Sequence, residues 1–321
     1  MTYRRTRNRR TFVRGAALAL AAVLAASGCA VKSTDGITSG GDTVNIALNS
    51  WVGYEADVAV VSYLLEHEMH YHVKITQIDE QPAWQALDQG TLDVILENWG
   101  HPDLVKTYID QKKTVVDGGP TGNKGVIGWY IPKYLADEHP DITNWKNLNK
   151  YASLFRTAES GGKGQFLGGA PSYVTNDKAL IKNLKLNYQI VYAGSEAAEI
   201  TQVKKLYKQH KPALFYFYTP QWLFNQVKLV KINLPKYTPG CDADVNKVAC
   251  DYPAYDLNKI FRKGFTKSGG KAYQLLKNFH WTDKQQNDVA GMIADQGMDR
   301  DTAARKWVEA NRATWEKWIP R

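Results

Sequence analysis

The sequence predicts an α/β fold with an open, largely parallel sheet, from the order and character of its first five elements. Segments 44–48, 72–78 and 92–96 have the apolar or alternating pattern of strands, and segments 55–69 and 82–87 between them have helical character. Strands that alternate with helices pair in parallel, because each helix carries the chain back before the next strand begins. The roughly 280 residues that follow the N-terminal segment are enough for two such lobes or for one large domain.

The first helix is expected from the spacing of its apolar residues. Val58, Val61, Leu64 and Leu65 recur three or four positions apart or side by side, which gathers them on one helical face. Later in the chain, Thr282 precedes an apolar-periodic run and is a helix-start signal. We expect further strands at 126–131, 154–157, 188–192 and 213–218, and helices at 142–148, 176–184, 197–209, 270–279, 283–296 and 300–318.

The C-terminal helices are expected to complete the first lobe, so the chain would cross between lobes twice, near 120–126 and 225–235. The predicted organisation is a signal peptide at 1–28, a small, polar tether at 29–42, lobe I formed by 43–124 with 231–321, and lobe II formed by 125–230.

The N-terminal segment has the pattern of an export signal. Residues 1–14 hold six arginines and no acid, and the uncharged run 16–26 is shorter than the 20 or so residues that span a bilayer. Ala26-Ser27-Gly28-Cys29 resembles the lipobox of bacterial lipoproteins, and Arg9-Arg10 resembles a twin-arginine motif. We therefore expect a protein exported and lipid-anchored through Cys29 to the outer face of the cytoplasmic membrane. The alternative is a short N-terminal helix with a buried cysteine.

Export also changes how the charge and the cysteines are interpreted. The chain has 41 basic and 32 acidic residues, and removing the six arginines of 1–28 leaves 35 against 32, a net charge of +3. This balance gives no case for nucleic-acid binding. Outside the cell an oxidising environment favours a disulfide between Cys241 and Cys250, with a metal site as the alternative.

Motifs of the common enzyme classes are missing from the sequence. There is no G-x-S-x-G elbow, P-loop or H-E-x-x-H motif, and the glycine-rich run 161–164 lacks the P-loop spacing. The histidines at 67, 70 and 72 are typical of a solvated helix end, with a metal site as the alternative. Nothing else supports Glu97 and Asp103 as a catalytic pair. The sequence thus predicts a protein that is not an enzyme and has no metal or cofactor. An exported hydrolase is the remote alternative.

Aromatic residues at the ends of predicted strands are the strongest indication of function. Trp51, Trp99 and Tyr218 each end or follow a strand, and Tyr173 lies just before a helix, where ligands of such sheets bind. Several rings around one cleft suit a quaternary ammonium group, which has no N–H to donate but is attracted by ring faces. For a zwitterion such as betaine, backbone N–H groups at 52–54 would hold the carboxylate. Aromatic clefts also bind sugars.

The mature chain resembles the glycine betaine/choline/proline-betaine family of ABC-importer substrate-binding proteins over most of residues 43–318. The resemblance rests on Asn49-Ser50-Trp51-Val52-Gly53, Gly90-Thr91-Leu92-Asp93-Val94, Glu97-Asn98-Trp99-Gly100-His101-Pro102, Trp129-Tyr130-Ile131-Pro132, Gly194-Ser195-Glu196-Ala197-Ala198, Tyr218-Thr219-Pro220-Gln221-Trp222, Leu276-Lys277-Asn278-Phe279 and Ala303-Ala304-Arg305-Lys306-Trp307-Val308.

This resemblance implies a type II periplasmic-binding-protein fold, two α/β lobes with a ligand cleft between them, and a monomer that works with a membrane permease. Trp51 and Trp99 match the family's first-lobe aromatic positions. Tyr218 stands where members often carry Trp, and Gln221 where they often carry His. Choline binders often have an acid where this chain has Gly53, which favours a betaine, with glycine betaine as the first choice, over choline. A binding protein of the same fold for choline, carnitine or another small solute is the alternative. The expected ligand-binding residues are Trp51, Gly53, Trp99, Tyr173, Tyr218 and Gln221.

Overall fold

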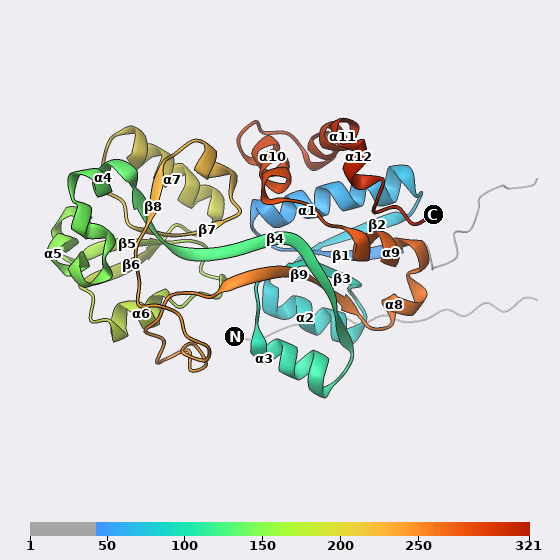
Figure 1. The fold of residues 1–321 in the computed structure, drawn as a ribbon, viewed down its shortest axis with the longest axis horizontal. Coiled ribbons are helices and arrows are strands. Elements are labelled where there is room, and N and C mark those ends of the chain that lie inside the picture. The colour runs from blue at the N-terminus through green and yellow to red at the C-terminus, as the bar shows by residue number, and fades with distance from the viewer. Residues whose placement is uncertain (1–42) are drawn as a thin grey trace, which may run out of the picture. The chain divides into compact units, whose positions relative to one another are not determined.

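The computed structural model describes residues 43–321, and it begins with the predicted alternation of strands and helices (Figure 1). The first strand pairs in parallel with the next two and lies between them. Its register with the second strand runs from Thr43 opposite His72 to Leu48 opposite Gln77. The elements are β1 (Thr43–Leu48), α1 (Val52–Tyr63) with a π-helical extension (Leu64–Glu68), β2 (His72–Gln77), α2 (Glu80–Gln89), β3 (Val94–Asn98) and α3 (Pro102–Leu104) with a second π-helical segment (Val105–Gln111).

Two long antiparallel strands connect the two halves of the sheet. β4 (Val115–Pro132) pairs with β9 (Ala254–Arg262), β9 pairs with β3, and the far part of β4 pairs with β7 (Phe215–Thr219). In Figure 1 both strands run side by side from the lobe that holds β1 to the lobe that holds β7. The strand order of this nine-stranded sheet is β2-β1-β3-β9-β4-β7-β5-β6, with β8 paired to β4.

The second lobe repeats the parallel pattern. β5 pairs in parallel with β6 and with β7, and helices lie between these strands in the chain. Its elements are α4 (Lys133–Glu138), α5 (Leu148–Tyr151), β5 (Gly164–Gly168), α6 (Asp177–Asn183), β6 (Tyr188–Tyr192), α7 (Glu196–Lys208), β7 and β8 (Leu229–Lys231), with short 3-10 turns at Pro140–Thr143, Trp145–Asn147, Ala152–Phe155 and Trp222–Asn225.

The C-terminal helices return to the first lobe. Gln286 of α10 donates to the carbonyl of Gly53 in α1, at 3.1 Å. The predicted start of α10 is confirmed, because Thr282 and Gln285 form a reciprocal capping box. None of the helices in the described part of the chain is both long and apolar enough to span a membrane. The helices are α8 (Phe265–Ser268), α9 (Gly270–Asn278), α10 (Asp283–Ala294), α11 (Arg300–Ala310) and α12 (Arg312–Trp315).

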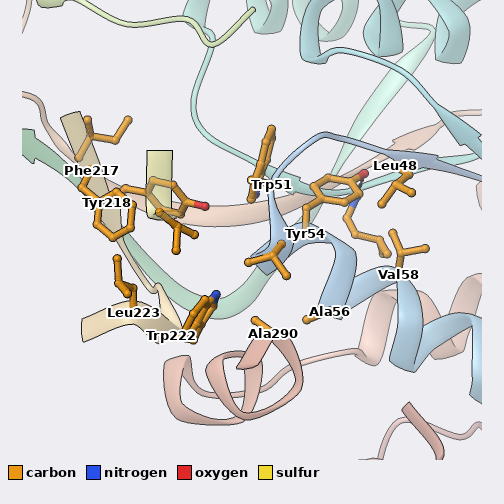
Figure 2. Packing of buried hydrophobic residues seen from close by; sticks show 14 of the residues in the cluster. Leu48, Trp51, Tyr54, Ala56, Val58, Phe217, Tyr218, Trp222, Leu223 and Ala290 are labelled. Atoms are coloured by element: carbon orange, nitrogen blue, oxygen red, sulfur yellow. Dashed lines mark hydrogen bonds between the residues drawn. The ribbon is translucent and has the colours of Figure 1, made fainter. Parts of the chain in front are cut away.

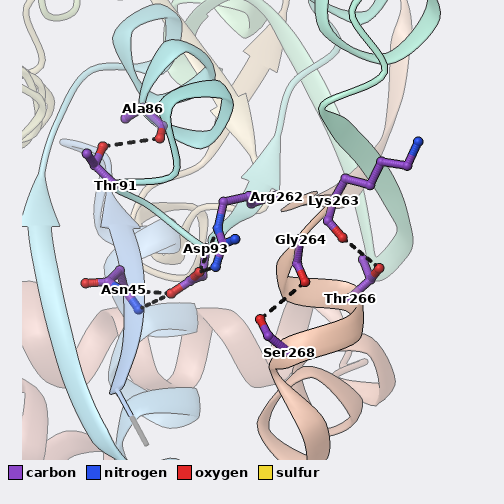
Figure 3. Close-up of polar contacts among 9 residues, drawn as sticks. All are labelled: Asn45, Ala86, Thr91, Asp93, Arg262, Lys263, Gly264, Thr266 and Ser268. Carbon is purple, nitrogen blue, oxygen red and sulfur yellow. Dashed lines mark hydrogen bonds and ion pairs between the residues drawn. The ribbon is translucent and has the colours of Figure 1, made fainter. Parts of the chain in front are cut away.

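Polar contacts hold the segment 90–94 in place (Figure 3). Gly90 ends α2 in the left-handed conformation, with φ of 80°. One carboxylate oxygen of Asp93 accepts two hydrogen bonds from Asn45, from its backbone N–H (2.9 Å) and its side-chain amide (2.8 Å). The other oxygen accepts from the guanidinium of Arg262 at the end of β9. Asp93 thus holds β1 in position relative to β9. The residues at the ends of these strands are held in position with them.

Three predictions of local structure were wrong. The segment predicted as a strand at 154–157 lies at the end of a 3-10 turn, and the strand begins at Gly164. The predicted helix at 142–148 forms 3-10 turns, and the predicted helix at 300–318 breaks at Asn311. β9 was not predicted, because its sequence mixes polar and apolar residues without a clean alternation.

The second crossing between lobes also differs from the prediction. Residues 231–253 stay with the second lobe, since Lys231 pairs with Asp251, and Asn183 of α6 donates to the carbonyls of Asn246 and Val248. The chain returns through β9, about twenty residues later than the expected crossing near 225–235. The predicted signal peptide, tether and Cys29 lie outside the described residues.

Candidate functional site

A cavity of about 620 Å³ lies between the two lobes, and aromatic side chains dominate its wall. The size is within the range of small-molecule sites. Trp51 and Trp99 come from the first lobe, and the other rings come from the second lobe, from the chain leading into β9 and from the start of β9. The aromatic lining is Trp51, Trp99, Tyr173, Tyr216, Tyr218, Tyr237, Tyr252 and Tyr255.

The two tryptophans are held from behind by one carboxyl group. Trp51 precedes the first residue of α1, and Trp99 follows β3. The indole N–H groups of Trp51 and Trp99 donate to the same Oε1 atom of Glu97, at 2.7 and 2.8 Å. Gln286 donates to the other oxygen. Burial raises the pKa of Glu97, while the hydrogen bonds from Trp51, Trp99 and Gln286 act in the opposite direction.

The rings of the two lobes meet edge to face. Trp99 and Tyr218 have ring centroids 5.4 Å apart at 82°, and Trp51 and Tyr173 have centroids 6.0 Å apart at 86°. Tyr173 in turn lies 6.1 Å from Tyr216. Such edge-to-face contacts fix ring orientation and leave ring faces available to a bound group. Figure 2 shows Trp51 and Tyr54 on one side of this packing and Tyr218 and Trp222 on the other.

A second buried carboxyl group, Glu196, connects the lobes. It is the first residue of α7, and one of its oxygens accepts from the backbone N–H of Val52 in α1 at 2.8 Å. The other oxygen accepts from the hydroxyl of Tyr218 and from the amide of Gln221, the latter at 2.8 Å. Burial raises the pKa of Glu196, and the hydrogen bonds from Tyr218, Val52 and Gln221 lower it.

The structure brings four of the six predicted binding residues to the cavity: Trp51, Trp99, Tyr173 and Tyr218. Gly53 lies behind the wall, because its carbonyl accepts from Gln286. Gln221 is also outside the lining, where its side chain bonds Glu196 and accepts from the N–H of Leu223. The backbone N–H of Val52, expected to hold a ligand carboxylate, is already paired with Glu196.

The charged side chains in the cavity wall are acidic. Glu80, Asp103 and Asp242 line the cavity, and among the described residues no lysine or arginine does. His101, also in the lining, is paired with Glu80. Anions that face a cavity lower the free energy of a cation inside it, so the wall favours a positively charged group.

The outer part of the wall is closed by a disulfide-linked segment. Cys241 and Cys250 are bonded, and the loop between them contributes Asp242 and Val245 to the lining. Tyr252, just beyond it, donates to Asp177 of α6 at 2.8 Å.

Sequence reasoning missed four of the lining aromatics. Tyr216 shares a face of β7 with Tyr218, and period-two alternation along that strand could have identified it. Tyr237 and Tyr252 precede β9 and Tyr255 is its second residue, on a stretch without a recognisable pattern. In residues 43–321, no cluster of three or more His, Cys, Asp or Glu side chains is arranged to hold a metal ion. His67 instead faces Asp301, at 3.4 Å.

Two α/β lobes joined by two long strands around an aromatic cavity define a solute-binding protein. The chain belongs to the family of substrate-binding domains of ABC-type glycine betaine transport systems, whose family model matches residues 42–310. The predicted family is thereby confirmed, and its members are transport components, not enzymes.

Individual relatives agree with this assignment. The chain is 24% identical over 299 residues to the trimethylamine N-oxide-binding protein of Pelagibacter ubique, covering 89% of this chain and 94% of that protein. It is 24% identical to the glycine betaine/proline betaine-binding periplasmic protein of Escherichia coli, covering 87% and 89%. Lactococcal OpuAC, solved in a closed conformation with glycine betaine, has the same fold, with a TM-score of 0.69, 22% identity, and coverage of 87% of this chain and 100% of that one.

Proposed function

We propose that this protein captures a small quaternary ammonium solute, with glycine betaine as the first candidate, and delivers it to an ABC permease for osmoprotective uptake. The observation that carries the proposal is the wall itself: two tryptophans and several tyrosines, with three acids and no lysine or arginine among the described lining residues. A trimethylammonium group offers only its charge and its methyl surface, and aromatic faces bind both. No bond is made or broken.

Cation–π attraction is expected to supply only part of the binding free energy, and lobe closure contributes to the rest. Cation–π attraction provides about 0.5–2 kcal/mol per ring, so three or four rings give roughly 1.5–8 kcal/mol, with about 4 kcal/mol in the middle of that range. Micromolar affinity requires about 8 kcal/mol. Burial of the methyl groups as the lobes close and hydrogen bonds to the solute supply the difference. Tyr173 and Asn176 offer hydrogen-bond donors in the lining.

A second candidate ligand class is a quaternary ammonium compound or N-oxide without a carboxylate, such as choline or trimethylamine N-oxide. It is favoured by the pairing of the Val52 N–H with Glu196, which occupies the helix start where a carboxylate would bind. A relative is named for trimethylamine N-oxide, and a choline-binding protein solved with choline, at a TM-score of 0.69 and 19% identity, has the same fold.

Calorimetry with a ligand panel tests the proposal. Glycine betaine, choline, proline betaine, carnitine and trimethylamine N-oxide are titrated into the mature protein. Micromolar binding of at least one is expected, and the rank order separates the two candidates. A protein that binds none of them contradicts the proposed ligand class.

We also propose that the mature protein is a monomer tethered to the outer face of the membrane through Cys29, which would keep it near its permease. The sequence before Cys29 supports this. A Cys29→Ser variant is expected to lose acyl labelling and leave the membrane fraction. Retention of the label would contradict lipid attachment at this residue.

A further inference from the structure

Glu97 occupies an unusual place relative to the cavity. It is not part of the lining, and its side chain is buried with only 2% exposure. A single oxygen accepts from both cavity tryptophans, which lie on separate segments, one before α1 and one after β3. Within the described residues no other hydrogen-bonding group joins these two indoles. The relative position of the rings therefore depends on this atom.

The hydrogen bonds between Glu97 and the two indoles also have an electrostatic consequence. An ionised carboxylate that accepts from an indole N–H places negative charge close behind the ring, in a region of low effective dielectric. A cation on the opposite face of the ring is attracted both by the ring and by this charge. The neighbouring Asp57 has its pKa raised well above its ordinary value, first by burial and then by the charge of Glu97. Both oxygens of Glu97 accept hydrogen bonds from N–H groups, those of Trp51, Trp99 and Gln286, and such donors stabilise the ionised carboxylate.

We propose that Glu97 is a positioning residue for capture of the cation: it holds the indole rings of Trp51 and Trp99 in the cavity wall and supplies negative charge behind them. The inference rests on the proposed function, because it concerns the same cavity and the same class of ligand. It goes further by assigning a role in affinity to a residue that does not line the cavity.

The direct test compares E97Q with the wild type on matched pairs of ligands. Choline is paired with 3,3-dimethylbutan-1-ol, and glycine betaine with 3,3-dimethylbutanoate, in which carbon replaces the charged nitrogen at nearly the same shape. We expect E97Q to raise the dissociation constant of the ammonium ligand about tenfold, and to change that of the carbon isostere much less. Equal changes for both members of a pair, or no change, would overturn the role of the charge.

The matched control is E199Q. Glu199 of α7 is buried to the same extent, at 1% exposure, and does not line the cavity or bond an indole in the described structure. E199Q replaces a buried carboxyl group by an amide, as E97Q does. We expect E199Q to bind the ammonium ligand with an affinity near that of the wild type. This result would show that loss of a buried acid alone does not reproduce the effect of E97Q.

A spectroscopic measurement tests the contact without any ligand. In protein with nitrogen-15 in its indoles, W51F and W99F assign the two N–H resonances. E97Q should shift both, because the charged acceptor is lost, and E199Q should shift neither. If E97Q does not fold, E97D keeps the charge but withdraws it by one methylene and should shift the same two resonances. Unchanged resonances would overturn the inference.

The two proposals fail in different ways. A wild-type protein that binds none of the ammonium ligands contradicts the proposed function, while the indole resonances still decide whether Glu97 holds the rings. A wild-type protein that binds such a ligand, with E97Q binding it equally well, contradicts only the role of Glu97.

Discussion

The two walls of the cavity each depend on a buried carboxyl group, but the two groups are connected differently. Glu97 accepts hydrogen bonds only from residues of the first lobe: Trp51, Trp99 and Gln286. Glu196 belongs to the second lobe, yet one of its oxygens accepts from the backbone N–H of Val52 in the first lobe. The first arrangement can persist when the lobes separate, whereas the second must lose a hydrogen bond. One wall is therefore preorganised, and the other is sensitive to closure.

The second wall also contains the disulfide, so its stability should depend on that bond more than the stability of the first wall does. A Cys241→Ser, Cys250→Ser double variant is expected to lower the free energy of unfolding by about 2.5–3 kcal/mol, because the unfolded chain is no longer constrained by a loop of this size. Denaturant unfolding of the oxidised wild type and the variant measures the difference. A loss below about 0.5 kcal/mol would mean that the loop contributes little to the fold.

Trp99 is the ring where the two walls meet, since it contacts Tyr218 and Tyr255 edge to face and is fixed by Glu97. Trp99→Ala is expected to weaken binding of the ammonium ligand at least tenfold, through loss of one cation–π contact and of buried surface. The matched control is Trp145→Ala, which removes an indole outside the cavity lining. Calorimetry compares both, and an unchanged dissociation constant for Trp99→Ala would remove Trp99 from the proposed site.

Whether a residue of the walls could be predicted from the sequence depends on how far apart in the chain it and its contact partners lie. Trp51 and Trp99 could be placed because each follows a predicted strand, and strand ends of such a sheet converge. Glu97 appeared in the sequence only within a family motif and as one member of an unsupported acid pair, because two of its three partners, Trp51 and Gln286, lie 46 and 189 positions away. No local pattern encodes such contacts.

The same limit explains the errors in the fold. The first lobe was predicted well because its parallel strands are short, apolar and separated by helices. β9 was missed because a strand buried between β3 and β4 gets its burial from neighbours distant in sequence. The pairing of the α1 start could not be foreseen for a related reason: nothing local shows that Glu196, 144 positions later, accepts from the Val52 N–H.

The closure-sensitive wall can be tested by removing its cross-lobe hydrogen bond. Glu196→Ala takes away the acceptor for Val52 and Tyr218, and we expect about a fivefold loss of ligand affinity together with a more open ligand-free protein. Small-angle scattering of the free and ligand-bound forms measures opening as a larger radius of gyration. Wild-type scattering and wild-type affinity in this variant would show that Glu196 does not couple the lobes.

The smallest expected effects on ligand affinity come from the N-cap residues of the helices behind the two walls. They test whether the second wall is coupled to the ligand more closely than the first. Thr282 caps α10, which carries Gln286, and Ser195 caps α7, which begins with Glu196. Replacing either residue by alanine should cost about 1 kcal/mol of stability, because a backbone N–H loses its acceptor. Ser195→Ala should also weaken ligand binding slightly, since it loosens the neighbouring Glu196, while Thr282→Ala, four residues from Gln286, should leave affinity unchanged. Thermal unfolding and calorimetry on the pair give both quantities. Equal affinities in the two variants would mean that the start of α7 is no more closely coupled to the ligand than the start of α10.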